Sequence, residues 1–328
     1  MKYWFRYIKL LLLSLCTLIL VVACNSSTPQ LQSRQTPESI ASDCRVIEHD
    51  GGETKICGQP QKVVALSPAL LDILLSLGVQ PTGYAEVKLL NTKVFDNPSQ
   101  QIPFLGDRVT SQPVNLGTRH NPSIETLLQL KPDLILGEKF QLEANYKLFS
   151  SIAPTAFFQT EGETGWKPVM QETAQALNRE EQAKQAIASY NQLVETVKRQ
   201  IAPVASGQTM IVLGWENVSN QSFILSANSF VCKLLKDLGF DIIVEISGVS
   251  NISIEAVADI KADHILVMPT GDNTIDNAKQ QWQNDPILRL IPAVKAGKIY
   301  FLDYQINRIR GPIVAEIFIN QIRQFLQP

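Results

Sequence analysis

The residues of this chain best suited to chemistry are cationic and aromatic side chains, most of which follow predicted strands. They are Tyr84, Arg108, Lys139, Trp166, Trp215, Arg308 and Arg310. An arginine binds a carboxylate through a planar pair of hydrogen bonds, and a tyrosine or tryptophan ring covers an apolar or chelate face. Because loops at the carboxyl ends of parallel strands meet in ligand-binding crevices, this set indicates a site for an anionic chelate. Each arginine taken singly is more often a solvated surface residue.

Common catalytic signatures are missing from the sequence. It contains no GxSxG, HExxH or CxxC motif and no glycine-rich phosphate loop. Its histidines, His49, His120 and His264, fall in a predicted hairpin, a loop and a turn beside a strand. They are too few and too scattered for a metal site built mainly from imidazoles. We therefore expect a binding protein rather than an enzyme, with no cofactor and no direct metal ligands.

The elements that position these residues are organised around one long helix, predicted for residues 179–201. Its apolar residues recur at steps of three, one and four, which matches one face of an α-helix and no strand. Asn178 is a candidate N-cap, and Pro203 is expected to end the helix. An ordinary surface helix is the alternative interpretation.

Similar patterns lie on either side of this helix. Ser123-Ile124-Glu125 and Ser253-Ile254-Glu255 open two matching segments, which continue to Asp133 and Asp263 at a constant spacing of 130 residues. Each copy predicts a short amphipathic helix, a tight turn and a buried strand. A strand and a helix ending in Leu-Gly precede each copy. The repeat favours a duplicated α/β lobe, with the long helix as the connection.

The body of the chain alternates predicted strands and helices, which is typical of parallel α/β layers. We expect a first lobe at 44–177 with a leading hairpin, an interlobe helix at 178–203 and a second lobe at 204–328. The size suits two lobes with separate cores. A helix starting at Pro312 should dock on one lobe. Small ligands usually bind in the cleft between two such lobes.

The N-terminus has the layout of an export signal. Lys2, Arg6 and Lys9 precede an apolar run that is too short to span a bilayer, and residues 21–24 read Val-Val-Ala-Cys. This ending resembles a lipobox, so residues 1–23 would be removed and Cys24 acylated; a plain signal peptide is the alternative. Residues 24–43 are polar and read as a flexible tether. The mature chain would carry a net charge of about −5, and nothing indicates nucleic acid binding.

Residues 44–57 read as a β-hairpin. With Asp50-Gly51 as a two-residue turn, His49 opposes Gly52 and Cys44 opposes Cys57. Opposed residues of an antiparallel pair are close enough for a disulfide, which an exported protein can form. We therefore predict a Cys44–Cys57 bridge, with two free thiols as the alternative.

The order of these segments resembles one family. The runs ALSPALLDILLSLGVQPTGYAE, NPSIETLLQLKPDLILG, ISIEAVADIKADHILV and IPAVKAGKIYFLD, with the long central helix, resemble the iron-siderophore and cobalamin periplasmic substrate-binding proteins. The segment RIRGPIVAEIFINQIRQFL is similar to the ferric-dicitrate branch. The resemblance implies the class III architecture, in which two Rossmann-like lobes are joined by a rigid helix.

The resemblance also implies a function and partners. It implies a lipid-anchored, monomeric protein on the extracytoplasmic side of a membrane, which captures a ferric siderophore or ferric citrate and delivers it to an ABC permease. Glu125 and Glu255 match the glutamates that dock on the permease in this family, although both are also favoured by the helix dipole. A haem or cobalamin binder of the same fold would need an axial ligand or a mainly apolar cleft. An enzyme on this scaffold would need a catalytic pair.

Overall fold

The computed structural model describes residues 43–88, 90–160, 165–216, 222–244 and 252–327. Contacts divide the chain into Met1–Asp43 and Cys44–Pro328. The predicted signal peptide, Cys24 and all of the tether except Asp43 lie outside the described residues. The description below therefore concerns Cys44–Pro328.

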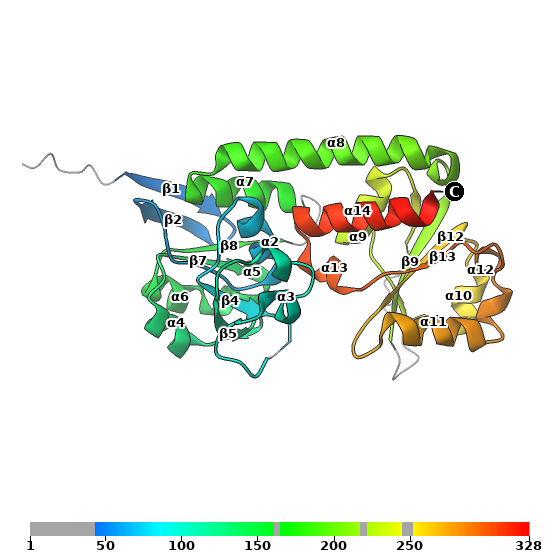
Figure 1. Ribbon diagram of the computed structural model, residues 1–328, viewed down its shortest axis with the longest axis horizontal. Helices are drawn as coiled ribbons and strands as arrows, with labels where there is room; N and C mark the ends of the chain where they lie inside the picture. The colour runs from blue at the N-terminus through cyan, green and yellow to red at the C-terminus, as the bar shows by residue number, and fades with distance from the viewer. Residues whose placement is uncertain (1–42, 89, 161–164, 217–221, 245–251, 328) are drawn as a thin grey trace, which may run out of the picture. The chain divides into compact units, whose positions relative to one another are not determined.

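A six-stranded sheet defines the first lobe (Figure 1). Its order is β6 (Asn121–Pro122), β5 (Val114–Thr118), β4 (Gly83–Glu86), β3 (Val63–Ala65), β7 (Leu134–Glu138) and β8 (Thr155–Phe158), with β6 antiparallel and the rest parallel. Its helices are α2 (Pro68–Ser76), α3 (Pro98–Gln101), α4 (Ile124–Leu130), α5 (Lys139–Leu142), α6 (Tyr146–Ile152) and α7 (Trp166–Leu177).

A five-stranded sheet defines the second lobe. It comprises β9 (Thr209–Trp215), β10 (Phe223–Ile224), β11 (Asp241–Ile243), β12 (His264–Pro269) and β13 (Ile299–Phe301), and β10 is antiparallel to β9. The helices are α9 (Phe230–Asp237), α10 (Ile254–Asp259), α11 (Ile275–Asn284), α12 (Pro292–Lys295), α13 (Gln305–Ile309) and α14 (Pro312–Leu326). The predicted α/β fold with two similar lobes is confirmed.

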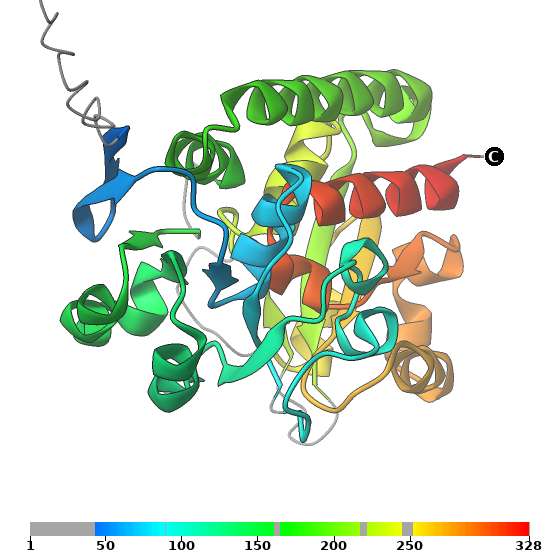
Figure 2. The same cartoon turned by 60° about the vertical axis from the view of Figure 1, so that its left-hand side comes forward.

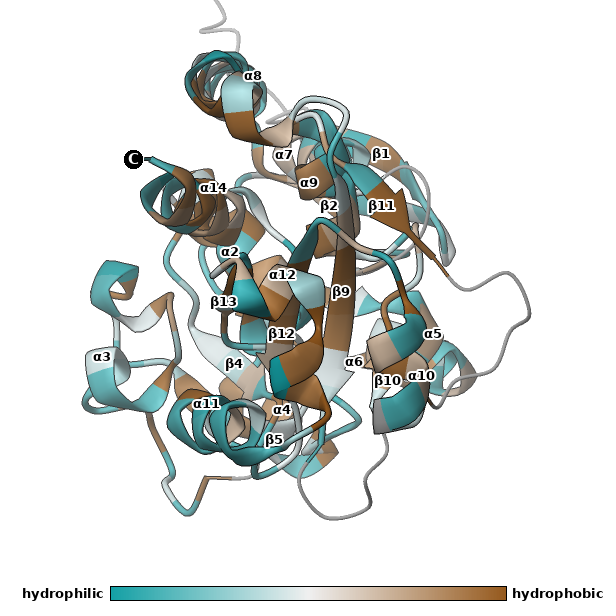
Figure 3. Ribbon diagram, turned by 90° about the vertical axis from the view of Figure 1, so that its right-hand side faces the viewer, coloured by the Kyte–Doolittle hydropathy of each residue, from teal (hydrophilic) through white to brown (hydrophobic). Residues whose placement is uncertain are grey.

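The lobes share part of their core. One cluster of buried apolar side chains contains Leu134 of the first sheet and Leu266 of the second, together with residues of α2, α8 (Glu180–Ala205) and α14. Each lobe also has a core cluster of its own, which contains Leu116 and Phe157 in the first lobe and Trp215 and Trp282 in the second, so the prediction of separate cores holds in part. The shared cluster arises because α14 returns from the second lobe to pack against α8 and α2. Figures 1 and 2 both show α14 beside α8. Figure 3 shows the hydrophobic strands β9 and β12 among helices that also carry hydrophilic residues.

The long helix is confirmed, although its ends differ from the prediction. Asn178 has a φ of 52° and ends α7 instead of capping α8, since asparagine tolerates the left-handed conformation. Pro203 lies inside the last turn of α8, which continues to Ala205. A proline there removes one backbone hydrogen bond, while Ile201 and Ala205 on either side of it are fully buried.

The predicted repeat is visible in equivalent hydrogen bonds. Ser123 and Ser253 each accept a bond from the backbone N–H three residues ahead and so cap α4 and α10. Asp133 Oδ2 accepts from the Lys62 N–H at 2.8 Å, next to β3. Asp263 Oδ2 accepts from the Thr209 N–H at 2.8 Å, at the start of β9. Each aspartate thus ties the start of the strand that follows it, β7 or β12, to the first strand of the same sheet.

The leading hairpin has the predicted register. β1 (Cys44–His49) pairs with β2 (Gly52–Cys57), and Cys44 faces Cys57 and is bonded to it. Arg45 donates to the backbone oxygens of Gln175 (2.9 Å) and Ala176 at the end of α7. Because these oxygens are among the last carbonyls of a helix, a guanidinium is a suitable partner for them.

Candidate ligand pocket

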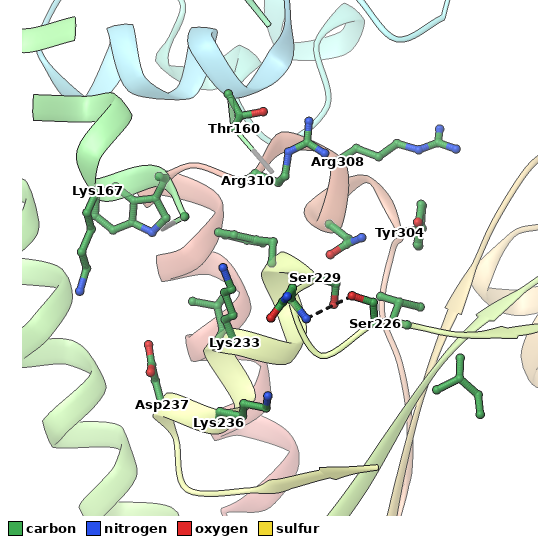
Figure 4. Close-up of a pocket in the computed structure, with 18 of the residues that line it drawn as sticks. Thr160, Lys167, Ser226, Ser229, Lys233, Lys236, Asp237, Tyr304, Arg308 and Arg310 are labelled. Atoms are coloured by element: carbon green, nitrogen blue, oxygen red, sulfur yellow. Dashed lines mark hydrogen bonds between the residues drawn. The ribbon is translucent and has the colours of Figure 1, made fainter. Parts of the chain in front are cut away.

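A pocket of about 770 Å³ lies between side chains of the two lobes (Figure 4). The first lobe contributes the start of α7 together with Arg119 and Thr160, and α8 contributes Tyr190. The second lobe contributes β10 and α9, and the segment after the second sheet contributes α13 and Arg310. The volume lies within the range of small-molecule binding sites.

The lining of this pocket is strongly basic. Its cationic residues are Arg119, Lys167, Lys233, Lys236, Arg308 and Arg310. Among the described residues that line it, Asp237 is the one carboxylate, and it accepts a 2.9 Å hydrogen bond from the Tyr190 hydroxyl. Burial, followed by the nearby Asp237, raises the pKa of Tyr190, so this tyrosine remains a donor. Such a pocket favours an anionic ligand.

Helix α9 presents its lysines to the pocket because it is amphipathic. Its apolar side chains Val231, Leu234 and Leu235 are buried in the core. Lys233 and Lys236 are spaced by three residues and therefore share one face, and Figure 4 shows both beside Asp237. The Ser229 hydroxyl caps this helix by accepting from the Cys232 N–H at 3.4 Å.

Two aromatic rings that line the pocket pack together at the start of α7. Trp166 is 5% exposed, and its ring meets Tyr190 edge-on at a centroid distance of 5.2 Å. Lys167 Nζ lies 4.6 Å from the centre of the same tyrosine ring and donates to Asn191 Oδ1 at 2.9 Å. Gly165 precedes the helix with a φ of 68°, which a glycine adopts without steric cost.

Arg308 belongs to the lining through α13. Its guanidinium carbon lies 5.1 Å from the centre of the Tyr304 ring, a cation–π contact that orients the group. The side chain is partly exposed. A guanidinium has five N–H donors, so Arg308 can form the paired bonds that a carboxylate accepts.

A buried polar network forms the floor near Arg310. Glu138, the last residue of β7, has one oxygen 2.8 Å from Arg310 Nη2 and the other 3.6 Å from Arg119 Nη1. Thr160 donates to the same glutamate at 2.5 Å. All four residues are at least nine-tenths buried. Two guanidinium groups therefore share one carboxylate beneath the pocket.

The network continues away from the pocket to Glu86. The Tyr84 hydroxyl donates to Glu86 Oε2 at 2.8 Å, and the Arg119 N–H donates to the Glu86 backbone oxygen at 2.8 Å. Burial raises the pKa of the Glu86 carboxyl, while bonds from Val87 and Tyr84 and the charge of Arg119 oppose this shift. Glu86 is thus a second buried acid, close to Arg119.

The structure brings three of the seven sequence-predicted ligand residues together in the pocket: Trp166, Arg308 and Arg310. The other four lie elsewhere. Tyr84 is fully buried against Phe95, and Trp215 packs on Trp282 and donates to Gln281 Oε1 at 2.6 Å. Arg108 and Lys139 form ion pairs with Glu316 at 3.9 Å and with Glu143 at 3.7 Å. Helix α11 packs over the second sheet, which explains why Trp215, at the end of a strand, joins a core cluster.

The sequence interpretation missed many of the residues that line the pocket. The missed residues include Lys233, Lys236, Tyr190, Tyr304 and Lys167. One available signal was the pair of lysines on the polar side of FVCKLLKDLG. Taken alone, this pair of lysines indicates a solvent-exposed helix face. It indicates a pocket only when α9 is known to lie opposite α7.

The two predicted docking glutamates occupy matching places. Glu125 and Glu255 are both exposed in the first turns of α4 and α10. Glu125 Oε1 accepts from Gln129 Nε2 at 3.3 Å. Hydrogen bonds, first from its own backbone N–H and then from Ser253, lower the pKa of Glu255, so it is ionised near neutral pH.

Among the described residues, no helix combines the length and the hydrophobicity that a membrane span requires. No group of three or more His, Cys, Asp or Glu side chains among them could hold a metal ion.

Two α/β lobes with a basic pocket between them define a ligand-binding protein, and sequence comparison gives its family. The chain belongs to the periplasmic binding protein family, whose model matches residues 63–306. The resemblance found in the sequence is thereby confirmed.

Individual relatives are similar over most of their lengths. The chain is 29% identical to the Fe(3+)-citrate-binding protein YfmC of Bacillus subtilis, over 93% of this chain and 92% of that one. It is 24% identical to the Fe(3+) dicitrate-binding periplasmic protein FecB of Escherichia coli, over 82% and 86%. The structure of Staphylococcus aureus SirA with staphyloferrin B matches with a TM-score of 0.71 and 24% identity, over 86% of this chain and 98% of that one.

Proposed function

We propose that this chain captures a ferric siderophore or a ferric citrate chelate in the pocket between its lobes and delivers it to the permease of an ABC importer. The observation that carries the proposal is the charge of the lining, where six cationic side chains outnumber the lining carboxylate Asp237 and the buried Glu138 that pairs with Arg119 and Arg310. Ferric chelates built on carboxylates or catecholates are anionic. The names of the relatives, two of which refer to ferric citrate, support the same ligand class.

Arg308 offers the most direct test. Because its fork is held over Tyr304 in the pocket, Arg308→Ala should weaken binding of the best ferric chelate by about 2–5 kcal/mol. Arg308→Lys is the matched control: it keeps the charge and loses the paired geometry, so it should fall between wild type and Arg308→Ala. Unchanged affinity in both Arg308→Ala and Arg310→Ala would contradict the proposal.

A haem ligand is the alternative within this fold. The described residues of the lining include no His, Cys or Met, so a haem iron would find a tyrosine as its protein ligand. The basic lining favours the ferric chelate over a ligand that needs a mainly apolar cleft. A Soret band on mixing with haemin would favour the haem alternative.

The proposal extends to the membrane and the permease. Cys24 is acylated and holds the protein on the extracytoplasmic side, and Glu125 and Glu255 contact basic groups of the permease. Cys24→Ala should move the protein to the soluble fraction. An unmodified N-terminus at another residue in mass spectra of the mature protein would contradict the anchor.

A further inference from the structure

Asp72 is a fully buried aspartate on α2 that caps a helix far away in the sequence. Its two carboxylate oxygens accept from the backbone N–H groups of Ile313 (2.9 Å) and Val314 (3.0 Å), in the first turn of α14. The Ser76 hydroxyl donates to the same carboxylate at 3.3 Å. The N-cap residue of α14 is Gly311, which has no side chain to cap with. Asp72 thus supplies the cap from 241 residues away.

The contact leaves no room for another residue at position 311. A Cβ atom on Gly311 would lie 2.2 Å from Asp72 Cγ and 2.5 Å from Asp72 Oδ1. The φ of Gly311 is −119°, so the backbone itself would accept any residue, and the three atoms nearest to the added Cβ all belong to Asp72.

The residue before Gly311 is Arg310, whose backbone is left-handed, with a φ of 59°. Its side chain is bonded to Glu138 of the first lobe. Asp72, on the other side of the same turn, bonds to the backbone that follows. Glu138 of the first lobe thus holds the Arg310 side chain, and Asp72 of the same lobe holds the backbone three and four residues further on.

We propose that Asp72 is a positioning residue for ligand binding: by capping α14 it fixes the Arg310-Gly311 turn and thereby the direction of the Arg310 guanidinium. The inference rests on the proposed function, in which the pocket that Arg310 lines captures the chelate.

A role in stability alone explains Asp72 less well. Burial raises the pKa of Asp72 to about 7 against the opposing effects of its hydrogen bonds and of Arg108, so placing a carboxylate here costs free energy. Apolar residues often replace buried charges without loss of stability. A carboxylate that faces two N–H groups at the start of α14 instead specifies one geometry for the turn.

The test is a double-mutant cycle on the affinity for ferric citrate, or for whichever ferric siderophore wild type binds best. Asp72→Asn keeps one acceptor oxygen and should weaken binding about tenfold, and in an Arg310→Ala background it should cost less than about twofold. Gly311→Ala should displace the Asp72 side chain by steric contact with the new Cβ and should therefore weaken binding to a similar extent. Val314→Ala, which removes buried volume in the same turn and keeps its N–H, is the matched control and should lower the Tm with unchanged affinity.

Equal losses of affinity from Asp72→Asn with and without Arg310 would overturn the proposal, since a general loss of stability predicts additivity.

A second readout needs no ligand. In ¹⁵N spectra of the free protein, Asp72→Asn should shift the Arg310 Nε–H resonance and leave that of Arg308 in place. An unmoved Arg310 resonance would overturn the inference even if wild type binds ferric citrate, and a moved one would support it even if the proposed ligand is wrong.

Discussion

Arg310 Nη2 lies 2.8 Å from Glu138 Oε1, although 172 residues separate the two in the chain. Both side chains are nearly inaccessible, at 9% and 4% exposure. The contact links the segment after the second sheet to the end of β7 in the first, directly beneath the basic pocket. An arginine in this position is oriented before any ligand arrives, which lowers the cost of ordering it on binding.

Removing Glu138 should be strongly destabilising. Glu138→Ala leaves two buried guanidinium groups, Arg119 and Arg310, near each other without their shared carboxylate, and this should lower the free energy of unfolding by about 3–5 kcal/mol. Denaturant unfolding measures the change. Glu143→Ala, in the exposed pair with Lys139, is the control and should cost at most about 1 kcal/mol. Similar losses of unfolding free energy in the two variants would show that the buried network stabilises the fold no more than an exposed ion pair does.

The hairpin bridge predicts both a thiol count and a stability change. The mature, oxidised, unfolded protein should show Cys232 as its single reactive thiol, since Cys44 and Cys57 are bonded and Cys24 is expected to be acylated. Replacing both bridge cysteines by serine should lower the free energy of unfolding by about 2–3 kcal/mol, because the unfolded chain gains conformational freedom when the loop is no longer closed. Three reactive thiols in wild type would contradict the bridge.

His264 should make the protein sensitive to acid. The ring is 1% exposed, stacks on Tyr300 and lies edge-on to Phe240. Burial, followed by the charge of Lys298, lowers the pKa of His264 below its usual value, so the folded state holds the neutral ring. As the pH falls below about 6.5, the unfolded chain takes up a proton that the folded chain resists, and stability is lost.

The comparison with His264→Phe isolates this effect. Wild type should lose more free energy of unfolding between pH 7.5 and 5.5 than His264→Phe, which keeps the aromatic packing and cannot titrate. Parallel pH profiles for the two proteins would show that His264 is not responsible.

The paired glutamates should matter for transport and not for binding. Glu125→Arg with Glu255→Arg reverses two exposed charges in matching first turns, so fold and ferric-chelate affinity should remain while uptake through the cognate permease is lost. Glu195→Arg with Asp276→Arg makes the same charge change at other exposed sites and should leave uptake intact. Normal uptake in the first double variant would instead favour a local helix-dipole role.

Features that depend on neighbouring residues could be predicted from the sequence. The hairpin register follows from one turn, and the two matching segments that begin at Ser123 and Ser253 start with their predicted helices. The long helix was recognisable by its period. Its ends were not, because Asn178 serves the preceding helix and the buried Ala205 extends α8 beyond Pro203.

The pocket was harder to predict because it depends on how distant elements pack. Trp215 ends a parallel strand as expected, yet Trp282 of α11 covers it. Lys233 becomes a pocket residue because α9 lies opposite Trp166 and Tyr190. The contact of Glu138 with Arg310 joins two distant parts of the chain, and no pattern in the sequence of either part predicts this contact.

The central claim is that the pocket binds a ferric chelate, and a tryptophan-quenching titration tests it most directly. Trp166 lines the pocket and can report on an iron chelate bound beside it. The titration should compare ferric citrate, a panel of ferric siderophores, haemin and cobalamin under one set of conditions. We predict saturable quenching by ferric citrate or one ferric siderophore, weakened in Arg308→Ala. Binding of haemin or cobalamin with no response to any ferric chelate would contradict the claim.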